Sequence, residues 1–234
     1  MIITRTTFQT LKLHGFICLM YTPVYHFCLC LKLFLLLFLQ DLYGHSTFEL
    51  DILFLMDTSS GVDLQGYKME KGFVQRIALH LGVFNRGSRA ALVAYGANSL
   101  IIFGFGGYST NAEFVKRLNE APMFGGERRV DRALDTAAAL MLGARSTIPK
   151  AVVLIMAGKQ SSAPNALSIK DAARPLHHLG AWLYIMSIGQ SDARELQKAT
   201  IRPTDVFFAR SFSGLYGYIA PVARYIANIS GMLW

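Results

Sequence analysis

Cysteine is almost absent from this chain of 234 residues, and the three that occur, Cys18, Cys28 and Cys30, all lie within the first 30 residues. The remainder therefore cannot form an internal disulfide and must be held together by packing alone. Charged residues are also scarce, at 16% against 53% hydrophobic residues, a balance that excludes a disordered chain. The length allows one α/β domain and is too short for two of ordinary size with linkers.

The sequence also lacks the common catalytic motifs. It has no Gly-x-Ser-x-Gly elbow and no His-Glu-x-x-His pattern, so no nucleophile or zinc ligand pair can be named. The glycines at 104, 106 and 107 are not followed by Gly-Lys-Ser/Thr, and we interpret residues 104–107 as a flexible turn rather than a phosphate loop. Although the net charge is +8, no run of Lys and Arg with interleaved aromatic residues occurs, which argues against a nucleic-acid partner. We therefore expect a binding protein and not an enzyme.

The N-terminus is the most apolar part of the chain. Residues 15–39 are nearly all apolar and follow the basic residues Arg5 and Lys12. Residues 1–46 are therefore expected to be a secretory signal or a signal anchor that contacts the membrane, with everything after residue 46 on the outer side. As a secretory signal, the segment has a short apolar stretch, residues 33–39, after a long basic leader. As a spanning helix it is long enough but is interrupted by Pro23, His26 and Lys32. A third interpretation is that this stretch does not belong to the mature protein.

From residue 47 to residue 234, apolar runs of strand length alternate with amphipathic stretches of helical length. This alternation predicts an α/β fold with a doubly wound, mostly parallel central sheet flanked by helices. Two runs joined by Gly96-Ala97-Asn98 predict one antiparallel edge hairpin. The expected strands are 48–56, 89–95, 100–105, 151–156, 181–188 and 206–209. The expected helices are one through Tyr67 to Leu81 that stops near Gly87, then 111–119, 130–142, 168–179 with an interruption at Pro175, 191–199 and 215–229.

Function is expected where the carboxyl ends of the buried strands meet, because ligands of open α/β sheets bind at that edge. The loop there begins Asp57-Thr58-Ser59-Ser60-Gly61. This loop and three later segments resemble, in order and in spacing, the von Willebrand factor A (vWA) family over about residues 48 to 229. The four segments read DILFLMDTSSGVD, GGERRVDRALD, VVLIMAGKQS and LGAWLYIMSIG.

The resemblance implies one vWA domain at 47–234, of the extracellular-matrix branch that is similar to collagen VI or to matrilins. It implies extracellular protein-protein recognition, with a matrix or cell-surface protein as the partner. It also implies a metal-ion-dependent adhesion site, in which Mg²⁺ is held by oxygen ligands.

Only two of the five ligand positions implied by the resemblance keep a suitable residue. Asp57 and Ser59 match the first carboxylate and the first hydroxyl, whereas Gly61, Arg128 and Ala157 stand where a serine, a threonine and an aspartate belong. Arg128 brings a guanidinium to the place of a cation, so an ion pair between Arg128 and Asp57 is expected. We therefore predict a degenerate site with weak or no Mg²⁺ binding, and no other cofactor.

Three alternatives stay open. Asp57 and Ser59 could instead cap the first helix, because both side chains accept hydrogen bonds from free backbone N–H groups. Ser60 or Glu127 could supply a substitute oxygen, which would restore an Mg²⁺-dependent adhesion site. The domain could also be a structural spacer.

The remaining polar features have ordinary interpretations. The adjacent His177 and His178 point in different directions on a helix, and His80 has no Cys or His companion, so none is expected to bind metal. Asn228 begins the only N-glycosylation sequon, which is consistent with an exported chain.

Overall fold

The computed structural model of the chain describes residues 12–13, 16–17, 49–83 and 87–229. The chain divides into two compact units, residues 1–46 and 47–234. In the first unit, β1 (Lys12–Leu13) pairs antiparallel with β2 (Phe16–Ile17), and the rest of the expected targeting segment lies outside the described residues. Among the residues that are described, no helix has the length and hydropathy needed to cross a membrane.

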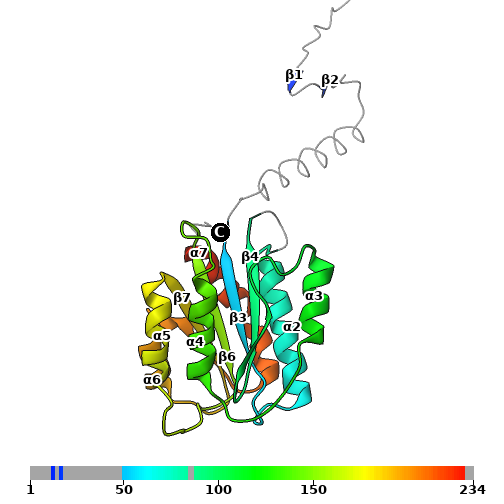
Figure 1. Cartoon of the computed structure of the whole chain (residues 1–234). Coiled ribbons are helices and arrows are strands. Elements are labelled where there is room, and N and C mark those ends of the chain that lie inside the picture. Colours follow the sequence, from blue (N-terminus) through cyan, green and yellow to red (C-terminus); the bar gives the residue numbers. More distant parts are fainter. Residues whose placement is uncertain (1–11, 14–15, 18–48, 84–86, 230–234) are drawn as a thin grey trace, which may run out of the picture. The chain divides into compact units, whose positions relative to one another are not determined.

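The second unit is built on a six-stranded sheet with the strand order β5-β4-β3-β6-β7-β8 (Figure 1). Every neighbouring pair is parallel except β4 and β5, which form an antiparallel hairpin at one edge. The expected α/β class and edge hairpin are thus confirmed. The strands are β3 (Asp51–Asp57), β4 (Arg89–Tyr95), β5 (Ser99–Phe103), β6 (Lys150–Met156), β7 (Ala181–Ile188) and β8 (Val206–Ala209).

Helices cover both faces of this sheet, because the side chains of the central strand alternate between two apolar cores. Ile52, Phe54 and Met56 point into one core, and Leu53 and Leu55 point into the other. The first core is closed by α2 (Leu64–His80), α3 (Asn111–Glu120) and α7 (Ile219–Ile229). The second is closed by α4 (Val130–Met141), α5 (Ile169–His178) and α6 (Ala193–Ala199).

Several predicted boundaries are wrong for local reasons. The first helix ends at His80 and not near Gly87, because Gly82 adopts a positive φ of 58° directly after the helix cap. The strand predicted to reach residue 105 ends at Phe103, where Gly104 accepts a hydrogen bond from Gly107 in a turn. The closing segment predicted as one helix is instead a 3-10 helix, η2 (Phe212–Tyr218), followed by α7.

Pro175 does not interrupt its helix as predicted. Helix α5 continues to His178, since the proline ring lies on the exposed side and removes only one backbone hydrogen bond. The opposite side of the same helix buries Ile169, Ala173 and Leu176 in the second core. This burial outweighs the local cost of the proline.

Helix α2 is capped by Asp63, whose carboxylate accepts a hydrogen bond from Gly66 N at 2.6 Å. The alternative in which Asp57 and Ser59 cap this helix is therefore wrong. Replacing Asp63 with alanine should lower the free energy of unfolding by about 1 kcal/mol, because one N–H group at the helix start loses its acceptor. Urea unfolding measures the change. Asp135→Ala, at an exposed position of α4, is the control and should change stability by less than about 0.5 kcal/mol; equal effects would contradict the capping role.

At the amino end of β3, the fully buried Asp51 is held by two arginines. Arg89 donates from Nε at 3.0 Å and from Nη2 at 2.5 Å, while Arg145 donates from its backbone N at 2.8 Å, Nε at 3.1 Å and Nη2 at 2.7 Å. Burial alone would raise the pKa of Asp51, but these hydrogen bonds outweigh burial and lower the pKa. The cluster joins the starts of β3 and β4 to the loop before β6.

Candidate functional site

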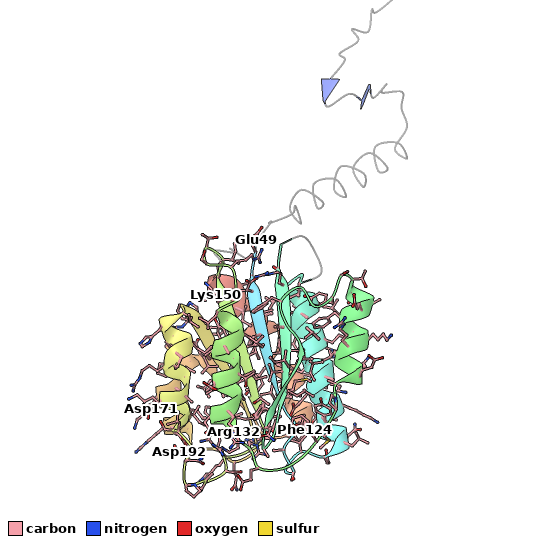
Figure 2. The ribbon with its side chains drawn as sticks, viewed as in Figure 1. Glu49, Phe124, Arg132, Lys150, Asp171 and Asp192 are labelled. Atoms are coloured by element: carbon pink, nitrogen blue, oxygen red, sulfur yellow. The ribbon has the colours of Figure 1, made fainter. Side chains whose placement is uncertain are left out.

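Three loops meet at the carboxyl ends of the strands, as expected. Ser60 donates its backbone N–H to Gly126 O at 2.9 Å and accepts from Gly126 N through its hydroxyl at 2.8 Å. Arg128 N donates to Ser161 Oγ at 2.9 Å, and Ser161 N donates back to Arg128 O at 3.0 Å. Figure 2 shows Phe124 and Arg132 at this end of the unit, opposite Glu49 and Lys150. The loops after β3, before α4 and after β6 thus form one surface.

Asp57 lies at the centre of this surface and is fully buried. Its Oδ1 accepts from Ser59 N at 2.9 Å, and its Oδ2 accepts from Ala157 N at 2.9 Å and from Arg128 Nε at 2.5 Å. The expected ion pair between Arg128 and Asp57 is therefore present. Both carboxylate oxygens are already engaged by groups of the protein.

The guanidinium of Arg128 fills the space between the loops, and the side chain is only 11% exposed. Its Nη1 donates to Lys159 O at 3.0 Å. Its Nη2 is buried, has no hydrogen-bond partner among the described residues, and faces Gly61. Ser59 is also buried, and its hydroxyl has no partner there.

These residues do not fit a divalent ion. Mg²⁺ requires several oxygen ligands in octahedral geometry. Position 157 supplies a methyl group and a backbone N–H, Gly61 has no side chain, and a positive guanidinium contacts Asp57 directly. In the described ranges, no three His, Cys, Asp or Glu side chains gather in a way that could hold a metal ion.

Residues 51–219 match the von Willebrand factor type A domain. The chain belongs to the vWA family. It is 29% identical over 164 residues to mouse (Mus musculus) von Willebrand factor A domain-containing protein 2, covering 67% of this chain and 20% of that protein. It is 25% identical over 206 residues to bovine (Bos taurus) cochlin, covering 81% of this chain and 36% of cochlin. Mouse collagen alpha-4(VI) chain is 27% identical over 163 residues, which cover 67% of this chain and 7% of the collagen chain.

Solved structures show the same fold. Proximal thread matrix protein 1 from the mussel byssus superimposes with a TM-score of 0.70 at 22% identity, covering 75% of this chain and 47% of that one. A further structure of that mussel protein, described as having a zinc-occupied MIDAS motif, gives a TM-score of 0.67 at 22% identity and covers 76% of this chain and 45% of that one.

This vWA domain is thus a non-enzymatic module related to extracellular-matrix proteins. The chain spans about a third or less of the length of the curated relatives named here.

Glu70 is a site residue that the sequence analysis missed. It lies on the buried face of α2, and its Oε2 accepts from Asp57 N at 3.0 Å. Burial, followed by the negative charge of Asp57, raises the pKa of Glu70 well above its ordinary value. The available signal was an acidic residue on the apolar stripe that also contains Phe73, Val74 and Ile77.

A second missed feature fixes the loop after β6. The buried pair Arg129 and Asp131 is bidentate, with N···O distances of 2.9 and 2.7 Å. Asp131 N donates to Gln160 Oε1 at 2.9 Å, and Gln160 Nε2 donates to Leu167 O at 2.8 Å. These bonds attach residues 160–167 to the start of α4. The surface formed by the three loops is therefore held by side chains on both sides of Arg128.

The histidines of the described residues, the glycines of residues 104–107 and Asn228 lie outside the candidate site. His177 contacts Ala199 O at 2.9 Å through Nε2, His80 contacts Arg76 O at 3.0 Å through Nδ1, and His178 is exposed. The glycines of 104–107 form a turn, and Asn228 is exposed on α7.

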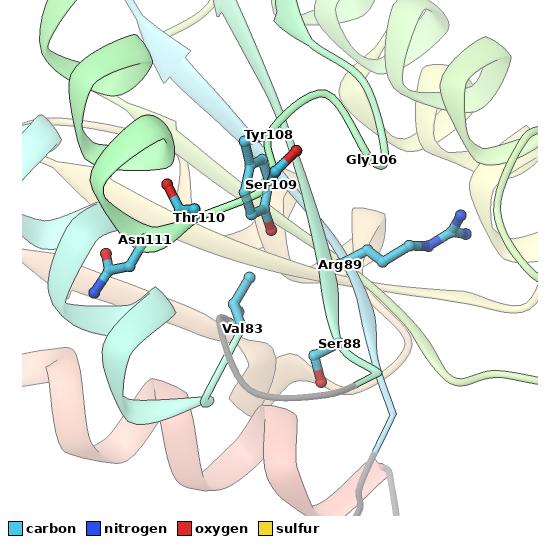
Figure 3. A pocket seen from close by; sticks show the side chains of 8 residues that line it. All are labelled: Val83, Ser88, Arg89, Gly106, Tyr108, Ser109, Thr110 and Asn111. Atoms are coloured by element: carbon cyan, nitrogen blue, oxygen red, sulfur yellow. The ribbon is translucent and has the colours of Figure 1, made fainter.

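A pocket of about 170 Å³ lies at the opposite end of the sheet (Figure 3). Ser88, Arg89, Tyr108 and Thr110 are among the residues that line it. Arg89 pairs with Asp51 at the start of β3, whereas Asp57 ends that strand, about 20 Å away at the usual rise per residue. The pocket is therefore separate from the candidate site.

Proposed function

We propose that this vWA domain recognises a protein of the extracellular matrix or cell surface, without a divalent ion, through the loops at the carboxyl ends of its strands. What carries the proposal is the match to the vWA domain together with relatives such as cochlin and a collagen VI chain. A surface of pre-ordered loops is suited to such binding, because little conformational entropy is lost when the partner docks.

The side chains exposed around these loops support recognition through apolar contacts. Leu64 begins α2 three residues after Gly61, and Met123 and Phe124 precede Gly125, whose N–H bonds to Thr58 O at 2.8 Å. Leu64 is 62% exposed and Phe124 is 41% exposed. Phenylalanine and methionine are enriched at protein interfaces, and charged residues are depleted from interface centres.

The test is binding of the full chain to purified collagens and to an extracellular-matrix preparation, in Mg²⁺ and in EDTA. We expect saturable binding that EDTA leaves unchanged. Phe124→Ala and Leu64→Ala should each weaken it by roughly tenfold, the usual effect of removing an interface anchor worth about 1.4 kcal/mol.

Leu142→Ala is the matched control, because Leu142 is 73% exposed at the far end of α4 and should not affect binding. Absence of saturable binding would favour the structural-spacer alternative. Binding that EDTA abolishes would favour the Mg²⁺-dependent alternative.

We further propose that the chain is secreted, or anchored in the membrane with the vWA domain outside, as residues 1–46 suggest. The exposed position of Asn228 on α7 leaves its side chain accessible to glycosylation. N-terminal sequencing of the exported protein tests whether residues 1–46 are removed, and a mobility shift on deglycosylation tests Asn228. Retention of the chain in the cytosol would contradict the proposal.

A further inference from the structure

The guanidinium of Arg128 bridges all three loops of the site. Nε contacts Asp57 Oδ2 at 2.5 Å in the first loop, and Nη1 contacts Lys159 O at 3.0 Å in the loop after β6. Arg128 itself belongs to the loop before α4, and its backbone N and O both bond to Ser161. One cationic group therefore makes contacts that hold the loops together.

Gly61 makes room for this guanidinium. A Cβ atom added at Gly61 would lie 2.6 Å from Arg128 Nη2, closer than a carbon and a nitrogen can approach without a shift. Gly158 packs on the other side, where an added Cβ would lie 3.3 Å from Nη1 and φ is +107°. A serine at position 61 is thus incompatible with Arg128 in its observed place, and the two departures from the family pattern are physically coupled.

We infer that Arg128 is a tethered cation that replaces the divalent ion and, together with Gly61, excludes it. The positive charge repels a second cation, and both Asp57 oxygens already accept hydrogen bonds from the protein. The loops are therefore held in one arrangement, and the surface is not regulated by divalent cations. The biological meaning of this exclusion of divalent ions rests on the proposed recognition function. Its physical test needs no binding partner.

The first experiment measures thermal unfolding of the full wild-type chain in EDTA and in millimolar Mg²⁺ or Mn²⁺. We expect a shift of less than about 1 °C, since an ion that does not bind the native state cannot stabilise it. Mn²⁺ should likewise cause no selective NMR broadening of the Ser59 and Ser60 amide signals. A saturable rise in Tm, or selective broadening of those signals, would overturn the inference.

The second experiment restores the family residues by combining Gly61→Ser, Arg128→Thr and Ala157→Asp. This variant should gain a Tm rise of about 5–10 °C at a Mg²⁺ concentration a hundredfold above Kd. The matched control adds Asp57→Ala and should lose the gain. A folded triple variant whose Tm does not change with Mg²⁺ would show that Arg128 and Gly61 are not what excludes the ion.

If the triple variant does not fold, a third measurement tests whether the site is shaped for a guanidinium. Arg128→Ala leaves a cavity of guanidinium shape beside Asp57, so millimolar ethylguanidinium should raise its Tm, whereas ethylammonium at equal concentration should raise it less. The wild-type chain should respond to neither. Equal effects of the two ions would contradict a site shaped for a guanidinium.

If Arg128 does not exclude the divalent ion, the experiments give a different result than if the proposed function is wrong. Metal binding by the wild-type chain contradicts the exclusion of the divalent ion by Arg128, and with it the metal independence of the proposed function, but it does not contradict matrix recognition itself. If the wild-type chain neither binds metals nor shows saturable matrix binding, the recognition function is contradicted and the exclusion of the divalent ion by Arg128 is supported.

Discussion

Arg128→Met is expected to lower the free energy of unfolding by about 3–5 kcal/mol, because it leaves the buried carboxylate of Asp57 without its cation. Methionine keeps much of the side-chain volume, so the loss is electrostatic rather than a packing defect. No other cation bonds to Asp57 in the described structure, so nothing replaces the lost guanidinium. Denaturant unfolding at neutral pH measures the loss.

The double variant Asp57→Asn/Arg128→Met separates this ion pair from its surroundings. Removing both charges should recover part of the stability lost in Arg128→Met, because a neutral amide costs less to bury than an unpaired carboxylate. The recovery is incomplete, because the amide NH2 group then faces the N–H of Ser59 or Ala157. Arg132→Met is the surface control: Arg132 is exposed on α4, and its loss should cost about 0.5 kcal/mol or less. Additive effects of the two single substitutions would show that Arg128 and Asp57 are not coupled.

The sequence was sufficient for the architecture because buried parallel strands have long apolar runs with few other interpretations. Strands β4, β7 and β8 have the predicted bounds. The errors concern element ends, where one turn decides the outcome, as at Gly82 and Gly104. Local propensity alone predicts a break at Pro175, whereas the burial of one side of α5 keeps the helix continuous to His178.

The ion pair at the site could be predicted because the resemblance to the vWA family places Arg128 and Asp57 at two ligand positions of one metal site. Other features of the candidate site depend on three-dimensional packing, which cannot be predicted from the spacing of residues in the sequence. Glu70 lies 13 residues after Asp57 on a helix, and only the folded chain shows that its carboxyl group accepts the Asp57 N–H. The fit of Gly61 against Nη2 likewise needs coordinates, because the sequence shows only that a serine is missing.

Asp51→Asn is expected to cost about 3–5 kcal/mol, the range found when one partner of a buried ion pair is removed. An asparagine amide would turn donors toward Arg89 and Arg145, which are themselves donors only. Glu49→Gln is the matched control: Glu49 also pairs with Arg145, at 3.0 Å, but is 44% exposed, so its loss should cost about 1 kcal/mol or less. Similar losses for the two variants would contradict the importance of burial.

The same carboxylate should make the domain sensitive to acid. The folded state lowers the pKa of Asp51 below the value of about 3.9 in an unfolded chain. The folded state therefore binds this proton less readily than the unfolded state, and the stabilisation is complete above about pH 4 and is lost as pH falls through the folded pKa. Unfolding free energies measured from pH 6 down to pH 2.5 should fall more steeply for the wild type than for Asp51→Asn, so that the difference between them shrinks with acid. A constant difference across this range would show that Asp51 does not titrate with folding.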